Sequence, residues 1–468
     1  MNTRKTNSVA DRLGRDRECL DPATGLRAST IEENTAFAHS MSKTLNRSLA
    51  VETTVLPNGL KIITESMPGA RSLSLGLWLR SGSRRETAAE NGISHFIEHM
   101  LFKGTERRTT QEIARELDTI GGYSDAFTGK EIVSFNAKAL DEHAAHAFDI
   151  LSDMMLRPLF REEDMGKEQG VVLEEIKMDL DSAESQTHEL FCKKFWKEDA
   201  LGWPILGSPK TVKSFHPKML REYWGRHYVP DNLLITAAGK VKHAAFVKMV
   251  DAVMGGMKKG EALPPLPEVK VFPQLARKTK PSLEQAQLCI AAPSYPMGHA
   301  KRFGCYLLNT ILGGGMSSRL FQNIRERQGL VYNISSELSL YRDSGAMAIY
   351  AGTSPGTLRR VVSSVMEELR GIKNGPVSAD ELRRAKDNLK ASVVLGLESS
   401  TSRMSNLARQ DIFFGRFWDL DETIAAIEAV QIADLQEIAN TFLKPENMAL
   451  TVVGPVMDDT FTRRDLAC

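Results

Sequence analysis

The chain has 468 residues, of which 42% are hydrophobic and 25% charged, the composition of a soluble globular protein. Its 60 Lys and Arg residues balance 59 Asp and Glu residues, which leaves no basic excess of the kind that nucleic-acid-binding proteins carry, so we expect no nucleic-acid partner. A chain of this length exceeds one ordinary hydrophobic core, and we expect two or more domains.

Cysteine usage and the N-terminal segment favour a reducing compartment. The 5 cysteines are scattered and form no CxxC pair, which argues against a disulfide framework. The N-terminal segment has no apolar run typical of a secretory signal, and its acidic residues fit a mitochondrial transit peptide poorly. No stretch approaches about 18 consecutive apolar residues, so we expect no membrane span. These observations predict a cytoplasmic protein.

The first part of the chain predicts a mixture of strands and helices. Residues 1–50 are polar and show no periodicity, and we interpret them as a disordered N-terminal extension. Leucines alternate through 71–83 with the period of a half-buried strand. The expected elements are two short strands within 53–66, a strand at 71–83, helices around 94–102 and at 110–120, 140–156 and 162–181, and a strand at 131–138.

A linker and a second, similar series of elements follow. Proline, glycine and lysine are concentrated at 254–281, which we interpret as the linker. Beyond it we expect a strand at 283–292, a helix at 300–312, strands at 330–340 and 345–352, and helices at 355–373 and 378–395. We infer a divergent internal repeat of the α+β class, with two homologous α/β domains at 51–253 and 282–460.

The stretch SHFIEHMLF, residues 94–102, contains a candidate metal site. In a helix, His95 and His99 project from one face about 6 Å apart, a separation that suits two ligands of a tetrahedral zinc ion. Glu98 lies one turn from His95 and can reach a water molecule rather than the metal. This HxxEH pattern is the inverted form of the zinc-peptidase motif HExxH. We expect Asn91 or Ser94 to cap the start of this helix. The same residues also fit the solvated face of an ordinary helix.

A third zinc ligand is expected from the helix at 162–181. Glu168, Val171, Val172 and Glu175 fall on one stripe, with a carboxylate at each end of an apolar middle. A carboxylate on a buried stripe is costly unless it is paired or bound to a metal. Glu174 is the competing candidate, but it is turned about 100° away from Glu175. A charged surface helix is the alternative interpretation of this segment.

Four motifs occur in order along the chain: HFIEHMLFKGT (95–105), VVLEEIKM (171–178), LGGGMSSRLF (312–321) and RERQGLVY (325–332). With them the chain resembles the pitrilysin/insulinase family of inverted-motif zinc peptidases over about residues 51–455. It looks closest to the branch of mitochondrial processing peptidase and its bacterial relatives. The resemblance implies a mostly antiparallel sheet flanked by helices in each domain, with the zinc motif only in the first.

The resemblance also implies roles for the candidate residues. One Zn²⁺ per chain is bound by His95, His99 and Glu175, with Glu98 as the general base that activates the zinc-bound water. Glu168 matches an acid that orients one of the ligands from behind. All of these assignments are expectations.

Three further residues are selected by the resemblance. Arg325 and Tyr332 match a pair that the family folds over the zinc to hold substrate and polarise its carbonyl. A helix-end arginine and a core tyrosine are the alternative interpretation of this pair. Asp125 stands in a loop and strand edge beside the cleft, where the family commonly has asparagine. It adds negative charge near the zinc and leaves the substrate preference open.

The sequence therefore predicts a zinc metalloendopeptidase that cleaves unfolded peptides or presequence-like segments. The resemblance implies a homodimer, or a heterodimer with a related chain. A non-catalytic assembly subunit and a catalytic subunit that is inactive without a partner are the alternatives. The resemblance favours the catalytic type, because the loop LGGGMSS is short, unlike the long glycine-rich loop of the family's non-catalytic subunit. A structural zinc would need a fourth protein ligand, for which His143 and His146 remain candidates.

Overall fold

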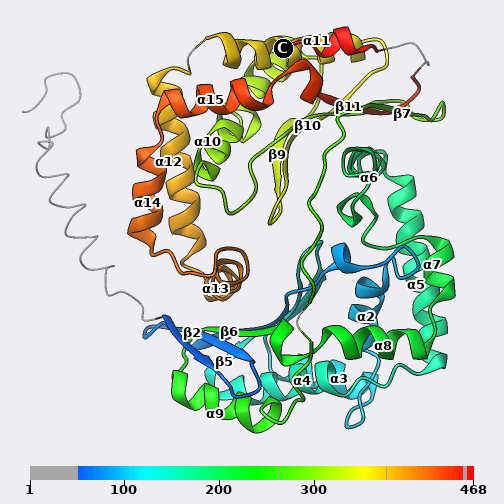
Figure 1. Cartoon of the computed structure of the whole chain (residues 1–468), viewed down its shortest axis with the longest axis vertical. Coiled ribbons are helices and arrows are strands. Elements are labelled where there is room, and N and C mark those ends of the chain that lie inside the picture. The colour runs from blue at the N-terminus through cyan, green and yellow to red at the C-terminus, as the bar shows by residue number, and fades with distance from the viewer. Residues whose placement is uncertain (1–50, 262, 376, 457–460) are drawn as a thin grey trace, which may run out of the picture. The chain divides into compact units, whose positions relative to one another are not determined.

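The structure is a computed structural model that describes residues 51–261, 263–375, 377–456 and 461–468 (Figure 1). The expected N-terminal extension, residues 1–50, lies outside these ranges. Two β-sheets with their helices make up the described part of the chain, which confirms the expected α+β class with two α/β units. Within the described ranges, no helix is long and apolar enough to cross a membrane.

The first sheet has six strands in the order β1-β2-β6-β3-β5-β4. Its strands are β1 (Val51–Val55), β2 (Lys61–Ser66), β3 (Ser72–Leu79), β4 (Tyr123–Thr128), β5 (Val133–Leu140) and β6 (Leu233–Gly239). All neighbours are antiparallel except β2 and β6, which are parallel. Among the described strands, β4 pairs with β5 alone and forms the edge of the sheet.

The described part of the first unit contains eight α-helices (Figure 1). They are α2 (Ile93–Leu101), α3 (Thr110–Thr119), α4 (Ala144–Leu156), α5 (Glu162–Asp181), α6 (Ala183–Phe195), α7 (Pro209–Ser214), α8 (Pro217–His227) and α9 (His243–Met254). The apolar sides of α2, α4, α8 and α9 meet the leucines of β3 in one continuous core. This core fixes α2, the helix that carries the two histidines, relative to the sheet.

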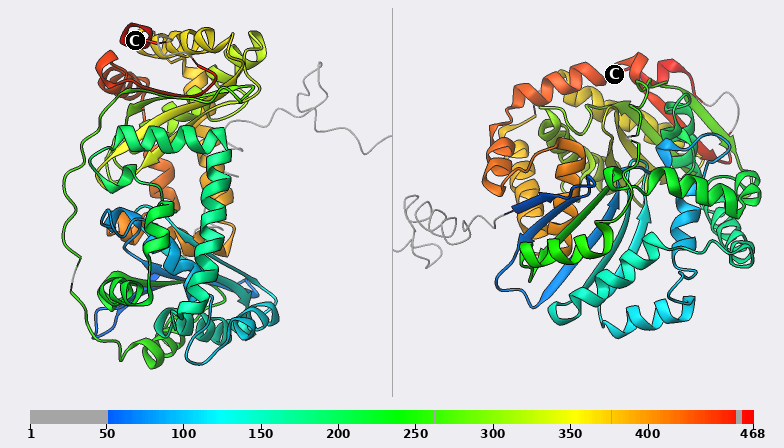
Figure 2. Two further views of the ribbon diagram at one scale, coloured as in Figure 1. Left: turned by 90° about the vertical axis from the view of Figure 1, so that its right-hand side faces the viewer. Right: turned by 60° about the horizontal axis from the view of Figure 1, so that its bottom comes forward.

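The second sheet repeats the strand order of the first. Its strands are β7 (Leu275–Thr279), β8 (Ala286–Pro293), β9 (Ile334–Leu340), β10 (Gly345–Thr353) and β11 (Ala449–Gly454), in the order β7-β11-β8-β10-β9. This matches β2-β6-β3-β5-β4 strand for strand, including one parallel pair, β7 with β11. Strand β7 lies within the segment 254–281 interpreted as a linker, and residues 263–274 before it are extended and irregular (Figure 2).

The helices of the second unit are α10 (Arg302–Gly313), α11 (Leu358–Asn374), α12 (Ala379–Gly396), α13 (Ser400–Phe414), α14 (Leu420–Ala429) and α15 (Ile432–Phe442). Helix α10 follows β8 as α2 follows β3, so the two helices are counterparts in the repeat. In the second unit this position contains no histidine.

Each unit supplies one helix to the sheet of the other. Helix α13 packs on β2, β3 and β6 of the first sheet, and α6 packs on β8 and β11 of the second (Figure 1). Asp411 on α13 is buried and pairs with Lys61 and, at 2.6 Å, with Arg80. The packing is close, since a Cβ at Gly76 of β3 would lie 2.5 Å from the sulfur of Met404 on α13.

This exchange corrects one prediction. Strand β3 is buried on both faces, not on one as its alternating leucines predict. The leucines enter the main core, while Ser74 and Trp78 on the other face lie under α13, where Ser74 Oγ is 2.9 Å from Ser400 Oγ. The polar side chain of Ser74 is therefore accommodated by a hydrogen bond to α13 and not by exposure to solvent.

Candidate metal centre and active site

Helix α2 presents His95 and His99 side by side. The two rings lie one turn apart with their centroids separated by 4.6 Å. The opposite side of the helix is buried in the core through Ile93, Phe96, Ile97, Met100 and Leu101. Burial, and next the neighbouring His99, lowers the pKa of His95 to about 4. His95 is therefore a neutral imidazole at pH 7, the form that binds a metal ion.

Helix α5 brings Glu175 to both histidines. Its carboxylate oxygens lie 3.7 Å from Nε2 of His95 and 3.7 Å from Nε2 of His99. Ligands of one tetrahedral zinc ion are separated by about 3.4 Å, so these two distances are compatible with a single zinc ion. Oε2 of Glu175 is also buried and accepts no hydrogen bond, as expected for an oxygen that coordinates a cation when one is bound.

The competing glutamate points elsewhere. Glu174 is exposed and pairs with Lys177 at 2.6 Å. Among the described residues, His95, His99 and Glu175 form the single group of three with metal-ligand geometry, with their donor atoms within 4.8 Å of one another. In the expected stripe on α5, Val172 is buried but Val171 is 45% exposed, so the buried middle of the stripe is narrower than predicted.

Glu168 supports the site from behind. One of its carboxylate oxygens lies 3.1 Å from Nδ1 of His99, and the other lies 2.7 Å from Nζ of Lys103. The residue is 4% exposed, so the ion pair with Lys103 offsets the cost of burying its charge. With its Nδ1 engaged in this way, His99 turns Nε2 toward Glu175.

Glu98 lies beside the cluster and is outside the group of three ligands. The hydroxyl of Thr128, the last residue of β4, donates a hydrogen bond of 2.5 Å to Oε2 of Glu98. Burial raises the pKa of the Glu98 carboxyl, while the hydrogen bond from Thr128 and the nearby His99 lower it. Glu98 therefore provides a carboxylate that can accept a proton, and Glu175 provides a different carboxylate that can bind a metal ion.

The start of α2 is held by a residue that the sequence analysis missed. The N-cap position is Gly92, with φ 95° and no side-chain cap, so neither Asn91 nor Ser94 caps the helix as predicted. Instead the buried Glu86 accepts N–H hydrogen bonds from Gly92 at 2.8 Å and Ser94 at 3.0 Å. Burial raises the pKa of Glu86 to about 7, and these hydrogen bonds oppose the shift.

The remaining predicted residues occupy the surroundings of the cluster. Asp125 is exposed on β4, opposite Asn136 of β5, and its charge raises the pKa of Glu98 after the larger effects of burial. Arg325 lies on a π-helix, Phe321–Arg327, with its guanidinium 5.8 Å from the ring centre of Tyr332. Tyr332 is 84% exposed, which contradicts a core tyrosine. Within the described ranges, no hydrogen bond or ion pair joins this arginine or tyrosine to the three ligands.

His143 and His146 do not contribute to the cluster. His143 lies 3.9 Å from Glu142, and His146 lies 3.5 Å from Glu116, both at partly exposed positions. In the part of the chain that the structure describes, the cluster therefore contains three candidate ligands and no fourth. Three ligands and an open position are typical of a catalytic zinc site.

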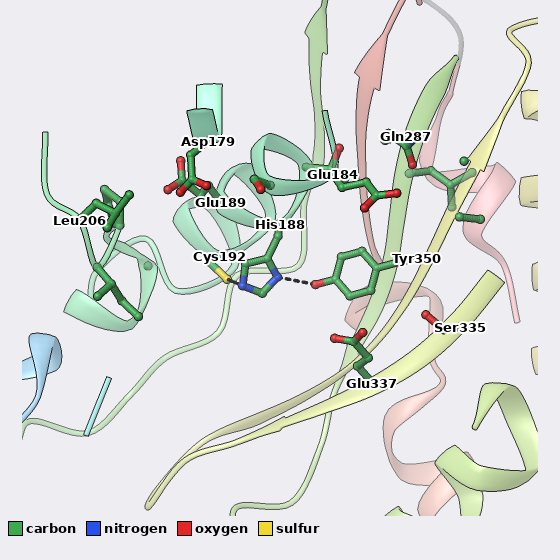
Figure 3. Close-up of a pocket in the computed structure, with 18 of the residues that line it drawn as sticks. Asp179, Glu184, His188, Glu189, Cys192, Leu206, Gln287, Ser335, Glu337 and Tyr350 are labelled. Atoms are coloured by element: carbon green, nitrogen blue, oxygen red, sulfur yellow. Dashed lines mark hydrogen bonds between the residues drawn. The ribbon is translucent and has the colours of Figure 1, made fainter. Parts of the chain in front are cut away.

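Figure 3 shows an acidic pocket of about 470 Å³, whose lining includes Asp179. Asp179 follows Glu175 by one turn of α5. The carboxylates of the pocket are Asp179 on α5, Glu184 and Glu189 on α6, and Glu337 on β9. His188 lies 2.7 Å from the hydroxyl of Tyr350 across the pocket, and burial, followed by Asp179, raises the pKa of Glu189. Lys130 also lines the pocket and lowers this pKa, but the carboxylates outnumber it, so the pocket offers several carboxylates to a positively charged group.

Comparison with known proteins agrees with the resemblance drawn from the motifs. The chain matches the family models described as Insulinase (Peptidase family M16), over residues 61–209, and Peptidase M16 inactive domain, over residues 214–389. It is 40% identical over 400 residues to the uncharacterized zinc protease YmxG of Bacillus subtilis, which covers 85% of this chain and 97% of YmxG. An uncharacterized zinc protease of Streptomyces coelicolor is 36% identical over 424 residues, 88% of this chain and 91% of the relative.

Solved structures share the fold at lower identity. A protease from Helicobacter pylori superposes with a TM-score of 0.81 at 21% identity, covering 87% of this chain and 99% of that protein. A protein from Pseudomonas fluorescens, described as a peptidase M16 inactive domain, gives a TM-score of 0.82 at 18% identity with the same coverage. At these identities the likeness establishes the fold alone.

Proposed function

Because the chain belongs to the insulinase family of M16 peptidases, we propose that it is a zinc metalloendopeptidase that binds one Zn²⁺ through His95, His99 and Glu175. The observation that carries this proposal is the separation of roles around the cluster. Three donor groups converge with no fourth protein ligand in the described ranges, and Glu98 lies beside them without joining them. We further propose that residues 51–253 form the catalytic domain and that residues 282–460 form the second, homologous domain, which lacks the zinc motif.

In this proposal Glu98 moves the proton. Zinc at such a site acidifies water to near neutral pH and polarises a peptide carbonyl. The Glu98 carboxylate takes a proton from the attacking water and later returns it to the leaving amine. Glu168 holds the ring of His99 throughout, and Arg325 and Tyr332 are proposed to hold the substrate once it is bound.

The substrate proposed is an unfolded peptide with positively charged side chains, as presequence-like segments have. Two features support it. Strand β4 is an edge strand among the described strands and can pair with an extended backbone next to Glu98. The acidic pocket one turn beyond Glu175 suits a lysine or arginine side chain. Asp125 on β4 adds negative charge close to the same base. A processing-peptidase-like activity, in a homodimer or with a related chain, follows from the same resemblance.

The test uses the purified full chain, zinc analysis and quenched fluorescent peptides. We expect one zinc per chain, cleavage of the peptides, loss of cleavage on chelation and its recovery when Zn²⁺ is added. Replacing a peptide's arginines with glutamine should lower kcat/KM about tenfold, which corresponds to about 1.4 kcal/mol. Undiminished cleavage by zinc-free protein would contradict the proposal. Inactivity at full zinc content, followed by activity when a related chain is added, would favour the partner-dependent alternative.

A further inference from the structure

The contact between Thr128 and Glu98 joins the edge strand to the proposed base. Thr128 Oγ1 donates to Glu98 Oε2 at 2.5 Å, a length typical of a strong hydrogen bond to a carboxylate. A carboxylate side chain on a helix has several accessible rotamers, and a single donor of this strength selects one of them. The bond also occupies Oε2, so that Oε1 is left to exchange a proton with water.

The strand pattern places the Thr128 hydroxyl on the side of the metal helix. Along β4 exposure alternates, with Tyr123, Asp125 and Phe127 exposed and the residues between them partly buried. Thr128 belongs to the partly buried face, which packs against α2. A threonine rotated to the other face could not reach Glu98, so the strand register fixes this contact.

The turn after Thr128 is held firmly. Gly129 N–H donates to the carbonyl of Ile132 at 2.8 Å, which closes the β4–β5 turn. The carbonyls of Gly129 and Lys130 accept hydrogen bonds from Ser83 and Arg84, at 3.1 and 2.8 Å. Gly82 allows this approach, because a Cβ there would lie 2.3 Å from the Gly129 carbonyl oxygen. The hydroxyl of Thr128 is therefore presented by a rigid hairpin, as positioning of a catalytic group requires.

We propose that Thr128 is a positioning residue that holds the Glu98 carboxylate in the orientation needed for proton transfer. The inference rests on the proposed function, because it concerns the base of that reaction. Thr128 itself transfers no proton, and within the described ranges no hydrogen bond joins its side chain to His95, His99 or Glu175. A misplacement of a reacting group by about 1 Å can cost on the order of 100-fold in rate, so loss of this hydroxyl has a measurable consequence.

The variant Thr128→Val tests the proposal, because it keeps the β-branched shape and removes the hydroxyl. We expect kcat to fall about 10- to 100-fold with KM and zinc content unchanged, and Thr128→Ser to restore kcat to within about threefold. Ser124→Ala, on the same face of β4, is the matched control and should behave as wild type. A kcat for Thr128→Val within twofold of wild type, or a loss that Thr128→Ser does not restore, would overturn the proposal.

A crystal structure of zinc-loaded Thr128→Val gives a readout that does not depend on activity. We expect the Glu98 carboxylate to leave the position it has in wild type, while His95, His99 and Glu175 stay in place. An unmoved Glu98 carboxylate would overturn the proposal. If the proposed function is wrong, the wild-type protein itself cleaves no peptide. If only the role of Thr128 is wrong, the wild-type protein cleaves peptides and Thr128→Val cleaves them equally well.

Discussion

Oε2 of Glu168 lies 3.1 Å from Nδ1 of His99, while Nε2 of the same ring lies 3.7 Å from Glu175. The imidazole thus contacts Glu168 through Nδ1, while its Nε2 faces Glu175 at a distance too long for a hydrogen bond; both glutamates lie on one helix, α5. Two turns separate these glutamates, and the ring spans the distance between their carboxylates. The orientation of His99 is therefore set by residues that a single helix keeps in register.

Replacing Glu168 with alanine should weaken zinc binding about 10- to 100-fold, because the ring of His99 loses its partner and Lys103 loses its ion pair. Competition with a zinc chelator of known affinity measures the change. Glu163→Ala, at an exposed position on the same helix, is the matched control and should bind zinc as wild type does. Equal zinc affinities for the Glu168 and Glu163 variants would contradict the role given to Glu168.

Removing both outlying histidines should leave the metal in place. His143→Ala with His146→Ala is expected to bind one zinc per chain, since both rings face other glutamates, whereas His95→Ala should lose most of it. Metal analysis after dialysis measures the zinc content of each variant. Loss of zinc from the His143 and His146 variant would instead indicate a four-ligand structural site.

The helix exchanged from the second unit should be important for stability. Asp411→Asn leaves Lys61 and Arg80 without their carboxylate under α13, and we expect the free energy of unfolding to fall by about 2–4 kcal/mol. Asp387→Asn removes an exposed ion pair on α12 and should change it by less than about 1 kcal/mol. Denaturant titrations compare the two variants. Similar small losses in both would contradict the importance of the α13 contact.

Glu86 should make the stability of the metal-free protein depend on pH. Its carboxyl has a pKa of about 7 in the folded chain, against 4.5 as the ordinary value, because burial disfavours its charge. A carboxyl with a raised pKa stabilises the fold below its unfolded pKa, and that contribution is lost as the pH rises through the folded value. The stabilisation contributed by Glu86 is therefore lost between pH 4.5 and about pH 7.

Glu86→Gln removes this titration. Between pH 4.5 and about pH 7, the free energy of unfolding of wild type should fall by about 3 kcal/mol relative to that variant. Glu222→Gln, at an exposed position, should follow the pH dependence of wild type. Parallel curves for wild type and Glu86→Gln would show that Glu86 does not titrate in this range.

Local patterns predicted the parts of the site that lie on single helices. The i,i+4 spacing placed His95 and His99 together, and the stripe on α5 selected Glu175, which the structure brings to both rings. The fold class followed from the repeated order of elements, because hydrophobic periodicity reports which face of an element is buried. The repeat is visible in the matching strand orders of the two sheets.

Contacts between distant segments were outside the reach of such patterns. The burial of both faces of β3 depends on α13, more than 300 residues further along the chain, and no local period reports a covering helix. The bond from Thr128 to Glu98 depends on how the β4–β5 hairpin packs on α2. Glu86 carried a local signal that went unused, an acidic residue a few positions before a helix whose N-cap is glycine.

The cleavage rate of zinc-loaded Glu98→Gln is the most direct measurement of the central claim. Glutamine keeps the size of the side chain but cannot accept the proton of the attacking water. We predict one zinc per chain in this variant, as in wild type, with peptide turnover lowered by at least about 1,000-fold. Turnover equal to wild type at full zinc content would show that Glu98 is not the base and would contradict the account.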